Sequence, residues 1–225
     1  MPYEPMSRNE QPIRLFKSSF LEFFTHVHPV VVLIIWLPVA LYHLALAVSA
    51  LPVSGLTPLH LVIGFLIGAV VWSLTEYTVH RFIFHFEPKS PPPWLERMIF
   101  LFHGIHHAQP WDKTRLVMPP AVSVPLALLF YFLFSRIVGG VMSAPQWVDV
   151  LFSGFVVGYV AYDMIHYATH HLPMKWGVLK WLKKHHMLHH YKTPNERYGV
   201  SSPAWDVVFG TYPDDEGMQS QVAES

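Results

Sequence analysis

The sequence predicts an all-α integral membrane protein, in which four transmembrane helices carry a cytosolic helical cap that holds a histidine-rich site. Two observations support this fold class. Hydrophobic residues make up 52% of the 225 residues and charged residues only 13%, whereas charged residues make up about 25% of an average soluble domain. In addition, twelve of the sixteen histidines fall in four short clusters beside long apolar stretches.

Four stretches are long and apolar enough to cross a bilayer, which takes about 20 residues at 1.5 Å each. In chain order they are residues 30–50, 59–79, 121–138 and 148–167. A short loop with Pro52, Gly55 and Pro58 joins the first two spans. The last two are joined by GGVMSAPQ, whose glycines and proline predict a tight turn.

The positive charges predict how these spans are oriented. Short cytoplasmic loops carry an excess of lysine and arginine, and four spans place both termini and the middle loop on one side. That side holds fourteen of the fifteen basic residues, all except Arg136, and all four histidine clusters. We therefore expect both termini and the site to be cytoplasmic, in either the endoplasmic reticulum or a bacterial inner membrane.

The first 29 residues are predicted to be a cytosolic or interfacial segment. They carry charges up to Glu22 and lack the pattern of a cleavable signal peptide. The apolar side chains of residues 11–28 have near-helical spacing, which predicts a helix that either lies in the membrane interface or packs on the domain. Residues 30–212 form the predicted membrane-embedded domain, and residues 213–225 a C-terminal tail.

Charge and cysteine content exclude several classes of function. The formal net charge is zero, so no basic surface points to nucleic acid as a partner. The chain contains no cysteine, which excludes disulfides, iron–sulfur clusters, thiolate zinc sites and cysteine nucleophiles. Any metal ion must therefore bind through nitrogen or oxygen.

The histidine clusters read HRFIFH, HGIHH, HYATHH and HHMLHH. Positions i, i+3 and i+4 of an α-helix share one face, so the second and fourth clusters can each direct three imidazoles to one place. His80 and His85 are five residues apart, so both point inward only if the helix ends or bends, which we expect near residues 81–84. The residues expected to face inward are His80, His85, His103, His106, His107, His166, His170, His186, His189 and His190.

Ten imidazoles exceed what one metal ion uses, since structural zinc takes four ligands and catalytic zinc usually three. They therefore predict two metal ions. Imidazole binds zinc, copper, iron and nickel, so the ligand type does not select the metal. Two metal ions at a membrane surface suit the activation of dioxygen beside an acyl chain. Glu76, four residues before His80, and Asp163, three before His166, are expected to orient metal-bound imidazoles.

Other residues are expected to lie outside the site. Trp72 and Trp147 are interpreted as interface anchors. His171 and His185 lie off the favoured helix faces, and helix geometry leaves open whether they are ligands or bystanders. A purely structural zinc site and a metal-transport site remain as alternatives; the first is unusual without cysteine, and the second usually lies near the bilayer midplane. The isolated histidines expected at the surface or interface are His26, His28, His43 and His60.

At these residues the chain resembles the fatty acid hydroxylase superfamily, and within it the fatty acid 2-hydroxylases. The resemblance runs through EYTVHRFIFH, HGIHHAQPWDKTRLVMPP, GYVAYDMIHYATHH, KKHHMLHHYK and YGVSSPAWDVVFGTYP, in order. It implies four membrane helices, a cytosolic cap and a dimetal centre whose ligands are the ten histidines named above. Two iron ions are expected for activity, with zinc as an alternative bound ion and molecular oxygen as co-substrate.

The resemblance implies a lipid hydroxylase that inserts oxygen at the 2-position of a fatty acyl chain, for sphingolipid or other membrane lipid synthesis. Two alternatives stay open: a sterol or carotenoid hydroxylase or desaturase of the same superfamily, and a non-catalytic metal-binding membrane protein. Arg115 and Lys113 are expected to meet either the polar head of the lipid substrate, or solvent and lipid phosphates.

Two features depart from the family pattern. Relatives often carry an N-terminal haem-binding cytochrome domain, whereas only about thirty residues precede the first span here, too few for a domain of about 50 residues. Electrons are therefore expected from a separate donor, a b-type cytochrome or a ferredoxin-like protein. His185 stands where the family pattern has tyrosine, which leaves its role undecided.

Overall fold

The structure is a computed structural model that describes residues 11–213. Four helices in this part of the chain are long and apolar enough to cross a membrane, and it contains no β-strand. The predicted all-α membrane fold is therefore confirmed. The expected tail at 213–225 and the start of the N-terminal segment fall mostly outside the described residues.

The four spans are α2 (Pro29–Ser49), α4 (Pro58–Val79), α7 (Pro120–Phe134) and α8 (Val148–His171). Two of them continue as π-helices: α4 into η1 (His80–Phe84) and α7 into η3 (Ser135–Val141).

Proline marks the start of α2, α4 and α7, where its missing N–H is not needed and its φ is already helical. The chain turns within GGVMSAPQ, as predicted, but its glycines do not form the turn, because η3 runs through Gly139 and Gly140. The chain instead reverses around Ser143, whose φ is 52°. A helical backbone bonds its own polar groups, which the membrane interior requires, so the helix continues past residues with poor helix propensity.

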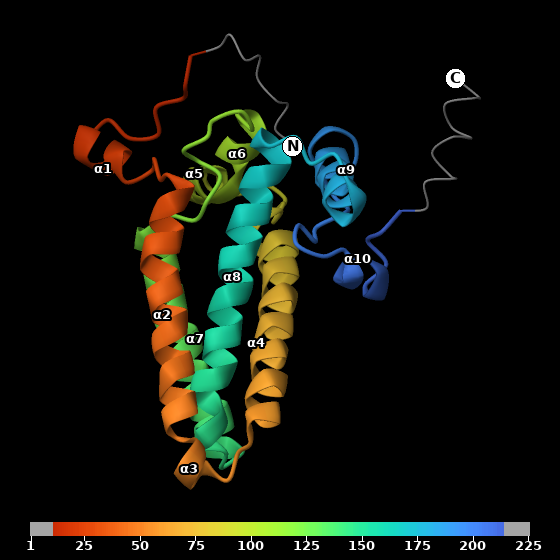
Figure 1. The fold of residues 1–225 in the computed structure, drawn as a ribbon. Coiled ribbons are helices and arrows are strands. Elements are labelled where there is room, and N and C mark those ends of the chain that lie inside the picture. The colour runs from red at the N-terminus through yellow and green to blue at the C-terminus, as the bar shows by residue number, and fades with distance from the viewer. Residues whose placement is uncertain (1–10, 214–225) are drawn as a thin grey trace.

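The span α8 is the centre of the bundle, with α2 and α4 on either side and α7 behind it (Figure 1). Most of its side chains are buried. Its Tyr159 contacts Trp36 of α2 and Trp72 of α4, with ring centroids 5.6 Å and 5.1 Å apart. The interpretation of Trp72 as an interface anchor is therefore wrong, because its side chain is buried between helices rather than at a span end.

Two glycines bring α4 and α8 close together. A Cβ built on Gly154 would lie 1.9 Å from the carbonyl oxygen of Phe65, and one built on Gly68 would lie 2.0 Å from that of Leu151. Small residues at such positions allow helix backbones to approach within a membrane. The glycines thus fix the spacing of the two spans that carry His80, His166 and His170.

Replacing Gly154 with alanine is expected to lower the free energy of unfolding by about 1–3 kcal/mol, because the new methyl group must push backbone apart. Thermal unfolding in detergent would measure the loss. Gly140→Ala is the matched control, since its added Cβ would come no closer than 3.9 Å to other atoms. Equal melting temperatures for the two variants would contradict the close approach.

The cap gathers at one end of the bundle (Figure 1). The expected single helix over residues 11–28 is replaced by a short one, α1 (Ser19–Phe23), because the chain before it bonds to the cap loop instead. The other cap elements are α5 (Pro93–Ile99), η2 (Phe100–Gly104), α6 (Ile105–Ala108), α9 (Gly177–Tyr191) and α10 (Ala204–Val208); α3 (Leu51–Ser54) and η4 (Pro145–Trp147) lie at the opposite end.

Candidate metal centre

The ten histidines expected to face inward come together in two groups of five. In each group, one ring nitrogen of every histidine lies within 4.8 Å of the others. His171 and His185, whose roles the sequence left open, belong to neither group. The first group is His80, His85, His103, His107 and His189, and the second is His106, His166, His170, His186 and His190.

Each three-histidine cluster is divided between the two groups, which corrects the expectation that its imidazoles point to one place. His103 and His107 belong to the first group, whereas His106 belongs to the second. In α9, His189 joins the first group while His186 and His190 join the second. Consecutive residues of a helix point about 100° apart. Adjacent histidines in these motifs therefore enter different groups.

Two π-helical turns adjust the directions of the histidines in the first group. The helix ends within the expected stretch: α4 widens into η1, which ends at Phe84, and the His85 N–H donates to the His80 carbonyl at 3.1 Å. In a π-helix each N–H bonds the carbonyl five residues earlier, so residues i and i+5 are separated by about one helical turn. His80 and His85 therefore face the same way. A second π-turn, η2, carries His103.

The nitrogens of each group are spaced as ligands of one metal ion. Neighbouring Nε2 atoms lie 2.9–3.1 Å apart, as between His103 and His107 or His106 and His166. Metal–nitrogen bonds of about 2.0–2.1 Å at right angles would put two ligand atoms about 2.9 Å apart. Imidazole nitrogen binds zinc, copper, iron and nickel, so the residues present fit a metal ion without selecting it.

Backbone carbonyls fix the tautomers of three histidines. Nδ1 of His80 lies 2.5 Å from the Tyr198 oxygen, Nδ1 of His166 3.1 Å from that of Leu116, and Nδ1 of His189 2.7 Å from that of Glu196. A carbonyl only accepts, so each Nδ1 carries the proton and each Nε2 has a free lone pair facing its group. Such orientation by a carbonyl is typical of metal-binding histidines.

Burial keeps the cap histidines neutral, as metal ligation requires. It lowers the pKa of His107 to about 3, and the pKa values of His103 and His186 well below the ordinary value. Neighbouring imidazoles lower these pKa values further. At neutral pH these rings therefore offer lone pairs rather than positive charges.

The carboxylates of Glu76 and Asp163 do not touch a histidine, contrary to the direct contact expected. Glu76 accepts the N–H groups of Val200 and Ser201 at 2.7 and 2.8 Å, together with the Ser201 hydroxyl. Asp163 accepts the N–H of Met118 at 3.3 Å. Glu76 therefore holds the chain segment next to Tyr198, whose carbonyl bonds His80. Asp163 holds the segment next to Leu116, whose carbonyl bonds His166.

Sequence reasoning missed Asp206, which completes this arrangement. Its buried carboxylate accepts the N–H groups of Tyr198 and Gly199 at 2.7 and 2.8 Å, the Thr211 hydroxyl at 2.8 Å, and lies 3.2 Å from His185 Nε2. Four consecutive N–H groups, from residues 198 to 201, are thus bound by two buried carboxylates. A usable signal existed, because Asp206 is the only charged residue from 198 to 213.

The four isolated histidines lie outside both groups and have other partners. His28 and His60 bond backbone at the starts of α2 and α4. His43 lies 2.7 Å from Asp149 at the end of the bundle opposite the cap. His26 bonds Thr114 and Arg115. These contacts stabilise helix ends and loops.

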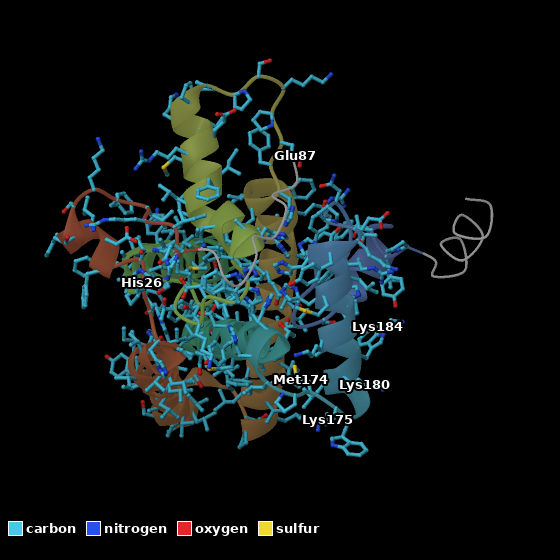
Figure 2. All side chains as sticks on the ribbon, turned by 90° about the horizontal axis from the view of Figure 1, so that it is seen from above. His26, Glu87, Met174, Lys175, Lys180 and Lys184 are labelled. Carbon is cyan, nitrogen blue, oxygen red and sulfur yellow. The ribbon has the colours of Figure 1, made fainter. Side chains whose placement is uncertain are left out.

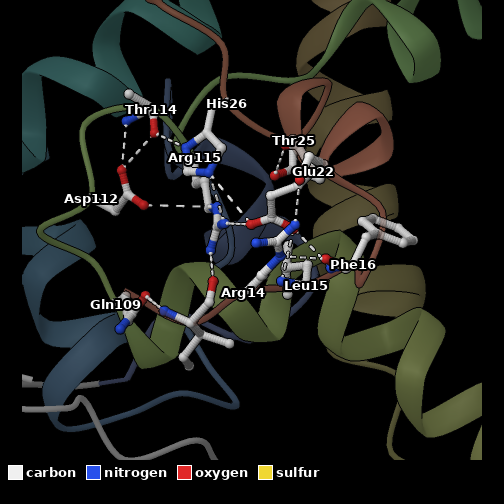
Figure 3. A network of polar contacts seen from close by, with 12 residues as sticks. Arg14, Leu15, Phe16, Glu22, Thr25, His26, Gln109, Asp112, Thr114 and Arg115 are labelled. Carbon is white, nitrogen blue, oxygen red and sulfur yellow. Dashed lines mark hydrogen bonds and ion pairs between the residues drawn. The ribbon is translucent and has the colours of Figure 1, made fainter. Parts of the chain in front are cut away.

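Arg115 does not meet lipid or solvent, because its side chain is buried and anchors the N-terminal segment (Figure 3). It bonds Glu22 at 2.5 Å and the Ile13 carbonyl at 2.6 Å. Burial raises the pKa of Glu22, but bonds from the N–H groups of Phe16 and Leu15 and the charge of Arg115 outweigh it, so the pKa lies below its ordinary value. Lys113, by contrast, is exposed.

Replacing Arg115 with methionine is expected to lower the free energy of unfolding by about 3 kcal/mol, because Glu22 loses its partner in a largely buried pair. Faster tryptic cleavage after Arg14 and a lower melting temperature would show this loss of stability. Lys113→Met is the control. Because the pKa of Glu22 is lower in the folded than in the unfolded protein, its ion pair contributes its full stabilisation above the unfolded value of 4.5. This stabilisation is lost as the pH falls through the folded pKa. The difference between variant and parent should therefore shrink only below about pH 4.5.

A narrow apolar cavity of about 50 Å³ lies among the four spans below the histidines. Its walls include Trp36, Trp72, Phe130 and Phe155. At its upper end Phe84 lines the cavity and also stacks on His103 of the first group, with centroids 4.9 Å apart and planes 13° apart. The cavity thus ends beside the candidate metal centre.

Fold and site together define a membrane-embedded protein with two histidine groups, each of which could hold a metal ion. A profile described as fatty acid hydroxylase matches residues 65–211, and the chain belongs to this family. It is 37% identical over 211 residues to the dihydroceramide fatty acyl 2-hydroxylase FAH1 of Arabidopsis thaliana, covering 94% of this chain and 84% of the relative.

Two further comparisons agree. The chain is 40% identical over 196 residues to the ceramide very long chain fatty acid hydroxylase scs7 of Schizosaccharomyces pombe, covering 86% of this chain and 53% of that one. It therefore spans about half the length of this fungal relative. A solved structure described as full-length scs7p, with only the hydroxylase domain visible, superposes with a TM-score of 0.78 at 39% identity, over 87% of this chain and 70% of that one.

Proposed function

We propose that this protein hydroxylates the 2-carbon of a fatty acyl chain in a membrane lipid, in sphingolipid synthesis or a related pathway. The observation that carries the proposal is the position of the two histidine groups at the end of an apolar cavity inside the bundle. The part of an acyl chain that enters this cavity would lie in apolar surroundings, next to the histidines. The activities in the names of the plant and fungal relatives support the same reaction.

The residues have distinct parts in this proposal. The ten histidines would hold two metal ions, with iron as the expected metal and molecular oxygen as co-substrate. Iron held in this way supplies the oxygen chemistry. The carbonyls of Tyr198 and Leu116, supported by Glu76 and Asp163, hold the imidazoles of His80 and His166 in place. The aromatic walls of the cavity position the chain and exclude water from it.

The proposal extends to the surroundings of the enzyme. Reduction would come from a separate electron donor, a b-type cytochrome or a ferredoxin-like protein. The cap and both termini would face the cytoplasm, because exposed lysines lie on α9, at Lys180 and Lys184, and just before it, at Lys175 (Figure 2). The membrane would be the endoplasmic reticulum or a bacterial inner membrane, and residues 30–212 would form the hydroxylase domain.

Lipid profiling tests the reaction directly. The chain is expressed in a host that lacks 2-hydroxy lipids, with iron and a reducing system supplied, and the total fatty acids are analysed. The expected result is new 2-hydroxy acyl chains. Hydroxylated or desaturated sterols or carotenoids would move the activity to another substrate class, and bound metal without any oxygen-dependent product would indicate a non-catalytic metal protein. Either outcome contradicts the proposal.

A further inference from the structure

Residues 198–213 have a composition unlike that of a chain in contact with water. They contain a single charged residue, Asp206, and its side chain is fully buried. The short helix α10 lies in this segment, and the side chains that it presents outward are apolar. Val207 is 66% exposed, Val208 65% and Phe209 49%.

Contacts with the spans fix the level of α10 along the bundle. Trp205 donates from its ring N–H to the hydroxyl of Ser73, at 3.0 Å. Ser73 follows Trp72, which lies level with Trp36 because both rings contact Tyr159. Trp36 is the eighth residue of α2, so this level is about 10 Å below the start of that span at 1.5 Å per residue.

Figure 1 shows the same arrangement, with α10 beside α4 and below the level at which α2 begins. The neighbouring face of α4 is exposed and apolar, with Val62, Leu66, Val70 and Leu74 at four-residue intervals. A helix that spans a membrane presents such a face to lipid. The outward side chains of α10 extend this face, and Phe209 stacks on Tyr77 of α4 with ring centroids 5.3 Å apart.

The backbone of α10 meets the requirement that the membrane interior imposes. No water is present there, so each backbone polar group needs a partner within the protein. The N–H groups of Val207 and of residues 209–212 all donate to backbone carbonyls. The Asp206 carboxylate is bound by four donors and does not meet lipid.

We propose that α10 is inserted among the lipid acyl chains of the leaflet next to the cap, with Val207, Val208 and Phe209 in contact with hydrocarbon. The partner is the bilayer itself rather than another protein, because residues 198–213 extend the lipid-facing side of α4 and add no exposed charged side chain to it. Arg81, one turn further along the helix, bonds the Tyr77 hydroxyl at 2.7 Å. The insertion anchors the loop whose Tyr198 carbonyl bonds His80, so lipid helps to hold this part of the cap. It does not depend on the reaction that the protein catalyses.

Spin-label accessibility tests the insertion, and the absence of native cysteine allows single labelling sites. A nitroxide is attached at Val208→Cys, with Leu66→Cys as the lipid-facing control and Lys180→Cys as the water-facing control. The protein is reconstituted in phosphatidylcholine vesicles. Relaxation by dioxygen, which concentrates in lipid, is compared with relaxation by a water-soluble nickel chelate. Val207→Cys repeats the measurement at a second position.

The labels at 207 and 208 are expected to respond like the label at 66, strongly to dioxygen and weakly to the chelate. The label at 180 should show the reverse. Chelate access at 208 equal to that at 180 would place α10 in water and overturn the proposal. Protection from both reagents would mean that protein covers the surface, and this result also overturns it.

Discussion

Replacing His107 or His190 with alanine is expected to abolish the hydroxylated product, with a loss of at least about 100-fold in rate. The two residues belong to different groups of five, so each variant removes one ligand from a different metal ion. Loss of a residue that merely supports a ligand already costs about 10–100-fold, and loss of the ligand itself costs at least as much. Product formation by lipid profiling measures the effect.

Metal analysis of the purified variants distinguishes loss of a ligand from loss of the fold. Each variant should remain folded and bind one metal ion more weakly than the other, His107→Ala in the first group and His190→Ala in the second. Since the proposed reaction needs both ions, removing a second ligand should add no further loss, and the double variant should be no less active than either single variant. His28→Asn is the control, since it removes a histidine but keeps a side chain that caps a helix well. Two tightly bound ions and full activity in either alanine variant would refute the assignment.

The second large effect is expected at Asp206, where alanine should lower both metal affinity and stability. The carboxylate binds four donors, including the N–H groups of Tyr198 and Gly199. Each buried donor left without a partner costs about 1–3 kcal/mol, so the free energy of unfolding should fall by at least about 3 kcal/mol. The Tyr198 carbonyl would also leave its position beside His80, and metal affinity in the first group should fall about 10–100-fold.

The two consequences are separated by measuring metal binding at temperatures where Asp206→Ala is still folded. Weakened binding confined to the first group would show that Asp206 positions a ligand and does more than stabilise the fold. The exposed Glu96, replaced by alanine, is the control for loss of an acidic side chain. Unchanged metal binding in folded Asp206→Ala would show a purely structural role.

Several parts of the structure were predictable because they depend on local sequence. A span needs about 20 apolar residues, and the observed spans begin within one residue of those predicted, at Pro29, Pro58, Pro120 and Val148. Histidine spacing on helices likewise identified the ten residues that the structure brings together. The π-turn at His80–Phe84 was only partly foreseen, since the spacing demanded a distortion but did not specify its form.

The sequence by itself determined the class of fold, the set of converging histidines and the end of the bundle where they lie, because hydrophobic length and helical period act within each segment. Tertiary structure alone decided how the histidines divide into two groups, what the carboxylates bind and where α10 lies. Glu76 and Asp206 bind neighbouring N–H groups of one loop, which lies more than 120 residues after Glu76 in the sequence. Arg115 bonds Glu22, from which it is separated by 93 residues of sequence. Such contacts depend on how helices pack, and no local period encodes them.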